Sequence, residues 1–228
     1  MIVGLALAAL VAAGCARGPA GGTGTEAAAV NRDTVTAALE TNAQVVKVEI
    51  MARGAKFDVV RDRSEASYAV GETFLGQKLD VVAVGKTTAL SGAIVLDEKG
   101  VIQPSVVEVD LTTLKSDQSR RDNRVQQVLD TRNHPRAVFQ ITGAEGDPVL
   151  KEGEDVPIKL QGTMTIKGTD RPLTFDGTAR LEGDTITLSA TATFNMTDFG
   201  VDPPNIANFV AVEEEVTVQV TFVGQKQG

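Results

Sequence analysis

The residues of this chain best suited to contact a ligand are apolar, and they recur at every second position. Apolar residues alternate with polar ones over 173–182 and again over 185–194. A period of two is typical of strands with one buried face, and Gly183-Asp184 between the two runs predicts a two-residue hairpin turn of type II′. The register places Gly177 opposite Ala190, so the middle of the apolar face carries small side chains. We therefore expect this face to line an open apolar tunnel.

Inward-facing residues of four predicted strands form the candidate ligand-binding set. They are Leu160, Met164, Phe175, Gly177, Leu188, Ala190, Phe194, Val218 and Phe222. The alternative is that these side chains pack against one another, because alternating apolar residues usually make a core. A barrel of about eight strands has a lumen just wide enough for side chains or for one slim ligand.

The wider pattern predicts an all-β fold with one short helix. Predicted strands cover 66–75, 79–84, 87–96, 101–111, 137–142, 157–167, 172–182, 184–197 and 215–223. Turn residues separate these strands, which indicates an antiparallel sandwich or barrel and not a parallel α/β sheet. Ser119-Arg-Arg-Asp122 resembles a capping box, and we expect a helix from Ser119 to about Thr131.

Composition and residue counts argue against several classes of function. A net charge of −8 and the absence of tryptophan make nucleic acid a poor partner. His134 is the single histidine and Cys15 the single cysteine, so neither a catalytic triad nor a His/Cys metal site can be assembled. The strand alternation points no polar group inward. We therefore expect no enzyme, no metal and no cofactor.

The N-terminal residues predict export and lipid anchoring. Residues 1–14 hold an apolar run too short to span a bilayer but long enough for a signal peptide. Ala12-Ala-Gly-Cys15 resembles a bacterial lipobox, although Ala12 stands where that pattern prefers leucine and no basic residue precedes the run. An ordinary secretory signal, or a buried N-terminal segment, is the alternative. We expect Cys15 to carry a lipid and residues 15–30 to form a flexible tether.

Several motifs together resemble the YceI-like family. They include Ser67-Tyr-Ala-Val70, Leu90-Ser-Gly-Ala-Ile-Val95, Ser105 to Leu114, Arg120-Arg-Asp-Asn-Arg124, Gly162-Thr-Met-Thr-Ile-Lys-Gly168, Pro172-Leu-Thr-Phe175 and Asp198-Phe-Gly200. His134 departs from the family pattern, which commonly has an aromatic residue before this proline. The resemblance assigns residues 57–224 to one barrel domain and leaves residues 31–56 as an extension of uncertain structure.

The resemblance implies an extended, lipocalin-like antiparallel barrel that binds a polyisoprenoid chain, such as a quinone or a prenyl phosphate. It also implies a periplasmic or other extracytoplasmic location, which agrees with the signal segment. We therefore expect a membrane-anchored lipoprotein that sequesters or carries a long apolar lipid. The alternative is a structural or adhesive cell-surface barrel with a filled core and no ligand.

Three arginines of the predicted helix are candidates for contact with the ligand's headgroup. Arg120, Arg121 and Arg124 could meet a phosphate or a quinone near the mouth of the barrel. Charges on a short exposed helix more often form a solvated face, and we favour that interpretation.

Overall fold

The computed structural model of this protein describes residues 54–74, 79–206 and 210–228. The predicted signal peptide 1–14, the tether 15–30 with Cys15, and the extension up to residue 53 lie outside the described residues. Among the described residues, no helix is long and apolar enough to cross a bilayer.

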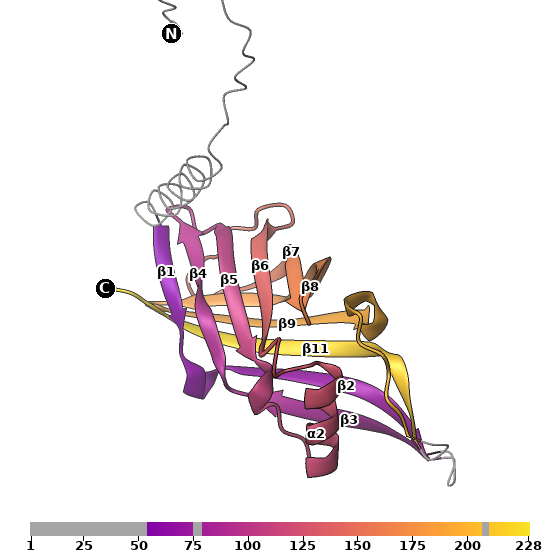
Figure 1. The fold of residues 1–228 in the computed structure, drawn as a ribbon. Coiled ribbons are helices and arrows are strands. Elements are labelled where there is room, and N and C mark those ends of the chain that lie inside the picture. Colours follow the sequence, from indigo (N-terminus) through magenta and orange to yellow (C-terminus); the bar gives the residue numbers. More distant parts are fainter. Residues whose placement is uncertain (1–53, 75–78, 207–209) are drawn as a thin grey trace, which may run out of the picture. The chain divides into compact units, whose positions relative to one another are not determined.

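Eight antiparallel strands close into a barrel (Figure 1). In order around the wall they are β1 (Gly54–Val59), β4 (Leu90–Asp97), β5 (Ile102–Asp110), β6 (Arg136–Ala144), β7 (Asp155–Ile166), β8 (Thr169–Glu182), β9 (Thr185–Asn195) and β11 (Val210–Lys226). The barrel closes at β1, where Phe57 pairs with Ile94 of β4 on one side and with Lys226 of β11 on the other. The predicted all-β, lipocalin-like barrel of about eight strands is therefore confirmed.

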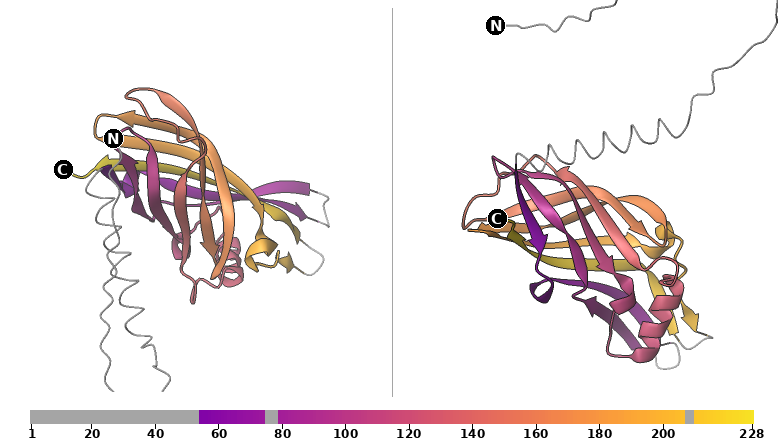
Figure 2. Two further views of the ribbon diagram at one scale, coloured as in Figure 1. Left: turned by 90° about the horizontal axis from the view of Figure 1, so that it is seen from above. Right: turned by 60° about the vertical axis from the view of Figure 1, so that its left-hand side comes forward.

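A two-stranded arm extends the wall beyond the closed part of the barrel. β11 has 17 residues, so its C-terminal end can pair with β1 while the rest pairs with β2 (Glu65–Phe74). The short helix η1 (Arg61–Arg63) separates β1 from β2, and β3 (Leu79–Thr87) pairs along the outer side of β2. The two-residue strand β10 (Asn205–Ile206) pairs with the start of β11. Figure 2 shows the arm reaching away from the C-terminus of the chain.

The helix α2 (Ser119–Val128) lies beside this arm (Figure 1). The chain before it is joined to β3, because the backbones of Lys86 and Lys115 exchange hydrogen bonds of 2.8 and 2.9 Å. The short helix η2 (Leu111–Thr113) connects β5 to this segment. The predicted capping box is wrong, since the N-cap residue is Gln118 and no side chain caps the helix.

The Asp122 carboxylate holds the segment before α2 and does not take part in a capping box. It accepts hydrogen bonds from the backbone N–H of Ser116 at 2.8 Å and from the Ser116 hydroxyl at 2.7 Å. These bonds keep the pKa of the buried Asp122 carboxyl below its usual value, although burial alone would raise it. Asp122 therefore fixes where α2 starts relative to β3.

The predicted β8–β9 hairpin is confirmed in register and in turn geometry. The ladder runs from Asp176 opposite Thr191 to Glu182 opposite Thr185 and includes the Gly177–Ala190 pair. Gly183 has a φ of 55°, whereas Asp184 is not among the residues with positive φ, as a type II′ turn requires.

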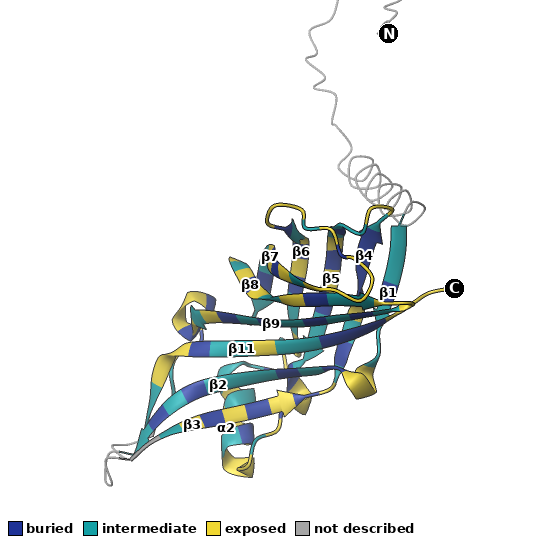
Figure 3. Cartoon of the chain, turned by 180° about the vertical axis from the view of Figure 1, so that it is seen from behind, coloured by how far each residue is buried: buried dark blue, intermediate teal, exposed yellow. Residues whose placement is uncertain are grey.

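One end of the barrel is filled by the protein's own side chains. Near the β4–β5 and β8–β9 turns, six inward residues are at most 4% exposed: Phe57, Leu96, Ile102, Ile158, Ala179 and Ile186. The β6–β7 connection crosses this end, where the Leu150 N–H donates to the carbonyl of Gly100 and the Gly153 N–H donates to that of Leu181. Leu150 is itself 4% exposed. Buried and exposed residues alternate along the strands, as Figure 3 shows most clearly for β3.

Candidate ligand-binding cavity

An apolar cavity of about 380 Å³ occupies the half of the barrel nearer to α2. Cavities of this size are typical of small-molecule binding sites. Eight of the nine predicted ligand-binding residues line it, namely Leu160, Met164, Phe175, Leu188, Ala190, Phe194, Val218 and Phe222. The structure therefore brings these residues together around one space, while their contact with a ligand stays a prediction.

Gly177 does not line the cavity, and the expected tunnel does not run through the barrel. A Cβ atom at Gly177 would collide with the carbonyl oxygen of Ser189 and lie 2.6 Å from the Ala190 Cα, so its missing side chain lets β9 approach. The side chains around Leu150 and Phe57 close that end of the barrel, so the cavity extends from its middle towards α2 only.

Aromatic side chains form much of the cavity wall. The rings of Phe139 and Phe175 lie 4.9 Å apart between their centroids, and Phe139 packs over Gly162, where a Cβ would lie 2.9 Å from two of its ring atoms. Nearer to the mouth, Phe194 makes an edge contact with Phe199 of the short helix η3 (Met196–Phe199), again at 4.9 Å. The apolar wall is thus continuous from β6 through β8 and β9 to η3.

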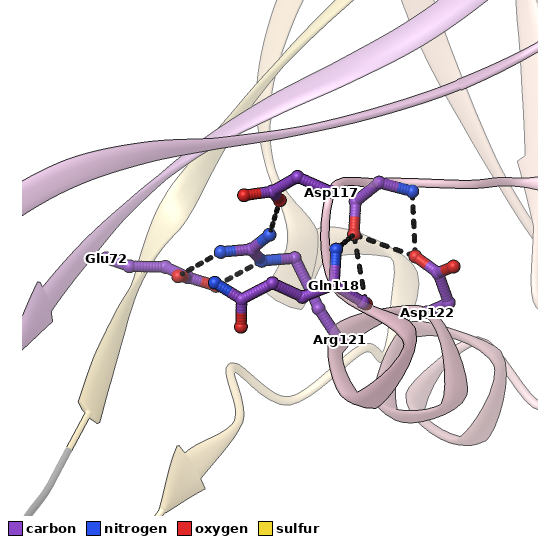
Figure 4. Close-up of polar contacts among 6 residues, drawn as sticks. Glu72, Asp117, Gln118, Arg121 and Asp122 are labelled. Atoms are coloured by element: carbon purple, nitrogen blue, oxygen red, sulfur yellow. Dashed lines mark hydrogen bonds and ion pairs between the residues drawn. The ribbon is translucent and has the colours of Figure 1, made fainter.

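A largely buried ion pair forms part of the cavity wall at the α2 end, and Figure 4 shows its contacts. The Arg121 guanidinium of α2 donates to both carboxylate oxygens of Glu72 on β2, from Nε at 3.0 Å and from the second terminal nitrogen at 2.9 Å. Its other terminal nitrogen contacts the Asp117 carboxylate. The side chains of Arg121 and Glu72 are each only 11% exposed, whereas that of Asp117 is 75% exposed.

The expectation that no strand points a polar group inward is therefore wrong. Glu72 projects inward from β2, and a signal for it exists in the sequence. Ala66, Tyr68, Val70, Glu72 and Phe74 occupy alternate positions, so the apolar members place Glu72 and Tyr68 on the inner face. Glu72 is tolerated there because Arg121 arrives from a different part of the chain to pair with it.

Tyr68 contributes a phenol group to the same end of the cavity. Its ring packs against β3 at Gly85, where a Cβ atom would collide with it. Burial raises the pKa of Tyr68 to about 12, while the nearby positive charge of Arg121 partly opposes this shift. Within the described residues the Tyr68 hydroxyl has no hydrogen-bond partner, so it can donate to a group in the cavity.

We predict that Tyr68 ionises at about pH 12 in the folded protein, against its ordinary pKa of 10.0. The chain contains one tyrosine and no tryptophan, so the near-ultraviolet absorbance change with pH reports this single group. Because the unfolded state releases the phenol proton first, the free energy of unfolding should fall as the pH rises from 10.0 towards about 12. If the absorbance titration of the folded protein has the same midpoint pH as that of the protein unfolded in denaturant, the Tyr68 phenol is fully solvated.

Arg120 and Arg124 lie on a solvated face of α2, as we expected from the sequence. Both are exposed, although both line the cavity, and the Arg124 guanidinium donates a hydrogen bond to the Gln127 side chain at 3.4 Å. Arg121 differs from them because its side chain is only 11% exposed and is paired with Glu72. His134 contacts Gly168 in the β7–β8 turn, where a Cβ would lie 2.9 Å from its ring, so it packs as a structural residue. The described part of the chain contains no cluster of metal-ligating side chains.

The fold and the cavity define a closed antiparallel barrel with an apolar binding cavity that opens at one end. The sequence matches the YceI-like domain over residues 57–224. This chain therefore belongs to the YceI-like family.

Curated relatives and solved structures agree with this assignment. A UPF0312 protein of Pseudomonas putida is 28% identical over 135 residues, which cover 55% of this chain, so the chain spans 65% of that relative's length. A polyisoprenoid binding domain from Saccharophagus degradans, implicated in plant cell wall breakdown, superposes with a TM-score of 0.59 at 15% identity over 75% of this chain and 98% of that domain. Burkholderia cenocepacia BcnA gives a TM-score of 0.57 at 18% identity over 73% of this chain and 99% of BcnA. At such identities, the structural likeness establishes the fold.

Proposed function

We propose that this protein binds a long apolar lipid of the isoprenoid type in its barrel and carries or sequesters it outside the cytoplasm. The observation that carries this proposal is the apolar cavity of about 380 Å³, which the inner faces of the strands surround without filling it. A neighbour with the same fold is described as a polyisoprenoid binding domain, which supports the choice of ligand class.

Burial of the chain supplies the binding free energy in this proposal. Each 100 Å² of apolar ligand surface removed from water contributes about 2.5 kcal/mol, before the cost of ordering the chain. Apolar side chains such as Ile94, Leu188 and Phe222 line the deep part of the cavity, whereas polar side chains such as Gln118 and Arg121 line it near α2. We therefore propose that the hydrocarbon chain lies deep in the barrel and that the headgroup lies at the α2 end.

The N-terminal sequence supports an anchored, extracytoplasmic carrier. Lipidation at Cys15 would tie the barrel to a membrane through the tether 15–30 and so hold it near a supply of apolar lipid. A reaction in the barrel is not part of this proposal. The Glu72 carboxylate, which points into the cavity, accepts hydrogen bonds from Arg121 at both oxygens and is therefore engaged in an ion pair.

Native mass spectrometry of the full-length protein, expressed in a bacterium and extracted in mild detergent, tests both parts of the proposal. We expect a non-covalent lipid that leaves the protein on collisional activation, and a separate covalent lipid mass that a Cys15→Ser variant lacks. Protein that binds no lipid, even after incubation with polyprenol, would support the rival interpretation of a structural or adhesive barrel. If the covalent lipid mass persists in the Cys15→Ser variant, Cys15 is not the site of lipidation, and the proposal that the barrel binds a lipid is unaffected.

A further inference from the structure

Helices η3 and α2 both border the open end of the cavity, but they differ in how firmly they are packed. Met196, Phe199 and Val201, in η3 and just after it, line the cavity and are each at most 9% exposed. Val125 and Val128 of α2 also line the cavity but are only half-buried. The η3 segment is thus part of the hydrophobic core, whereas α2 packs against that core from outside. A segment with few deeply buried side chains can separate from the rest of a protein at lower cost.

The helix α2 lies beside a part of the barrel where the strands leave an edge unpaired. β1 has six residues and joins β4 to β11 only near the closed end of the barrel. Nearer to the open end, the outer edge of β3 pairs with no further strand of the described residues. The connection between β5 and β6 (residues 111–135), which contains α2, lies beside this edge and is joined to it through Lys86 and Lys115 (Figure 1). Movement of α2 away from the β2–β3 arm would therefore open the cavity at its side.

The Arg121–Glu72 ion pair holds α2 to this arm. Arg121 belongs to α2 and Glu72 to β2, and the two hydrogen bonds between them cross from the helix to the sheet at 3.0 and 2.9 Å. Other polar side chains of α2 bond within the connection itself. The Asp122 carboxylate accepts from the segment before the helix, and the Gln126 amide donates to the carbonyl of Thr112 at 3.0 Å. These local contacts would move together with α2.

The arrangement of charges allows the ion pair to separate without leaving either group unsatisfied. Asp117 precedes Arg121 by one helical turn and contacts the same guanidinium, so Arg121 keeps a carboxylate partner when α2 moves. Glu72 stays on β2, where its side chain is 11% exposed while α2 covers it. Once α2 has moved away, water can reach the Glu72 carboxylate. The state that makes breaking a buried pair costly, a desolvated charge without a partner, is thereby avoided.

We propose that α2 is a lid on the cavity, held closed by the Arg121–Glu72 ion pair, and that the lipid enters and leaves when α2 moves away from the β2–β3 arm. This inference rests on the proposed function, since it concerns how a lipid reaches the barrel. The closed lid is the resting state with or without lipid. A weaker ion pair therefore raises the rates of association and dissociation by the same factor and leaves the affinity nearly unaltered.

Lipid transfer from the Glu72→Gln variant tests the role of the ion pair. The full-length protein is loaded with radiolabelled polyprenol and mixed with phosphatidylcholine vesicles, and both the rate of transfer and the fraction bound at equilibrium are measured. Glutamine keeps the shape of the side chain but removes the charge that strengthens its hydrogen bonds, so transfer should become at least about fivefold faster. The fraction bound at equilibrium should change less than about twofold.

Asp117→Asn is the matched control for Glu72→Gln. Both substitutions remove one carboxylate partner of the same guanidinium, but Asp117 is in the connection that carries α2 and is 75% exposed. Its loss does not weaken the attachment of α2 to the arm, so the rate of transfer should stay as in the unaltered protein. Equal acceleration by the two substitutions would contradict the lid.

A covalent bridge across the ion pair provides a second test that does not depend on Glu72→Gln. Glu72→Cys and Arg121→Cys are combined in a Cys15→Ser background, so that the two new thiols are the only ones in the chain. They are joined, after loading with polyprenol, by a short bifunctional reagent that forms a disulfide with each. We expect the bridge to slow release at least about tenfold and a reductant to restore it.

The outcomes separate this inference from the proposed function on which it rests. If the unaltered protein binds no polyprenol, the proposed function fails and the lid fails with it. If polyprenol binds, but its release is as fast with the bridge as after reduction, the barrel is a lipid carrier whose ligand does not pass α2, and the lid alone is wrong.

Discussion

Replacing Ala190 with phenylalanine is expected to weaken lipid binding by at least about tenfold while the barrel stays folded. Ala190 lies on β9 in the middle of the cavity wall and is 5% exposed. A phenylalanine ring there would occupy part of the space of about 380 Å³ in which the chain is proposed to lie. The open cavity beside it gives the ring somewhere to go, which limits the strain that overpacking normally causes. Retention of a polyprenol by the purified variant measures the effect.

Thr193→Phe is the control for this substitution. Thr193 lies on the same strand but is exposed on the outer face, so the added ring should not affect lipid retention. Far-ultraviolet circular dichroism verifies that both variants keep the barrel. If folded Ala190→Phe protein retains as much polyprenol as the unaltered protein, the lipid does not lie in this cavity.

Replacing Arg121 with alanine should lower the free energy of unfolding by about 3 kcal/mol. The substitution leaves the Glu72 carboxylate buried without its partner, and a carboxylate desolvated on one side cannot recover the lost interaction from water. The expected loss corresponds to a decrease of about 1–2 M in the midpoint of urea unfolding. The contact of Arg121 with the exposed Asp117 contributes little to this loss, since ion pairs with exposed partners are weak.

A double variant distinguishes a broken ion pair from lost packing. Glu72→Leu combined with Arg121→Leu removes both charges and keeps apolar bulk in the wall, so it should recover most of the stability that Arg121→Ala loses. Equal stability of Arg121→Ala and the unaltered protein would mean that Glu72 is well solvated.

The strand alternation predicted an antiparallel sandwich or barrel, the family resemblance selected the barrel, and the alternation also placed the inward residues of four strands. In β7, β9 and β11 the residues expected to face inward do so, because a half-buried strand fixes which side each residue occupies. Glycine at the first position of the β8–β9 turn fixed the register of that hairpin. Strand β1 was not predicted, since its six residues carry no long alternating run and its pairing partners β4 and β11 are distant in the sequence.

The shape of the cavity could not be derived from one hairpin. Small residues at Gly177 and Ala190 suggested empty space, but whether space remains depends on the side chains that the opposite wall contributes. Phe57 and Leu150, from β1 and from the β6–β7 connection, are buried at the closed end of the barrel. The pairing of Glu72 with Arg121 could not be predicted from the sequence either. The two residues are 49 positions apart, and only the position of α2 against the β2–β3 arm brings them together.

Photochemical cross-linking tests most directly whether an apolar chain occupies the barrel. A polyprenyl analogue with a photoreactive group at the end of the chain distant from its headgroup is bound to the full-length protein and irradiated, and the labelled residues are identified by peptide mass spectrometry. The account predicts labels at the deep end of the cavity, around Leu188 and Phe222. Labels confined to exposed apolar residues of the outer surface, such as Val82 and Val106, would contradict it.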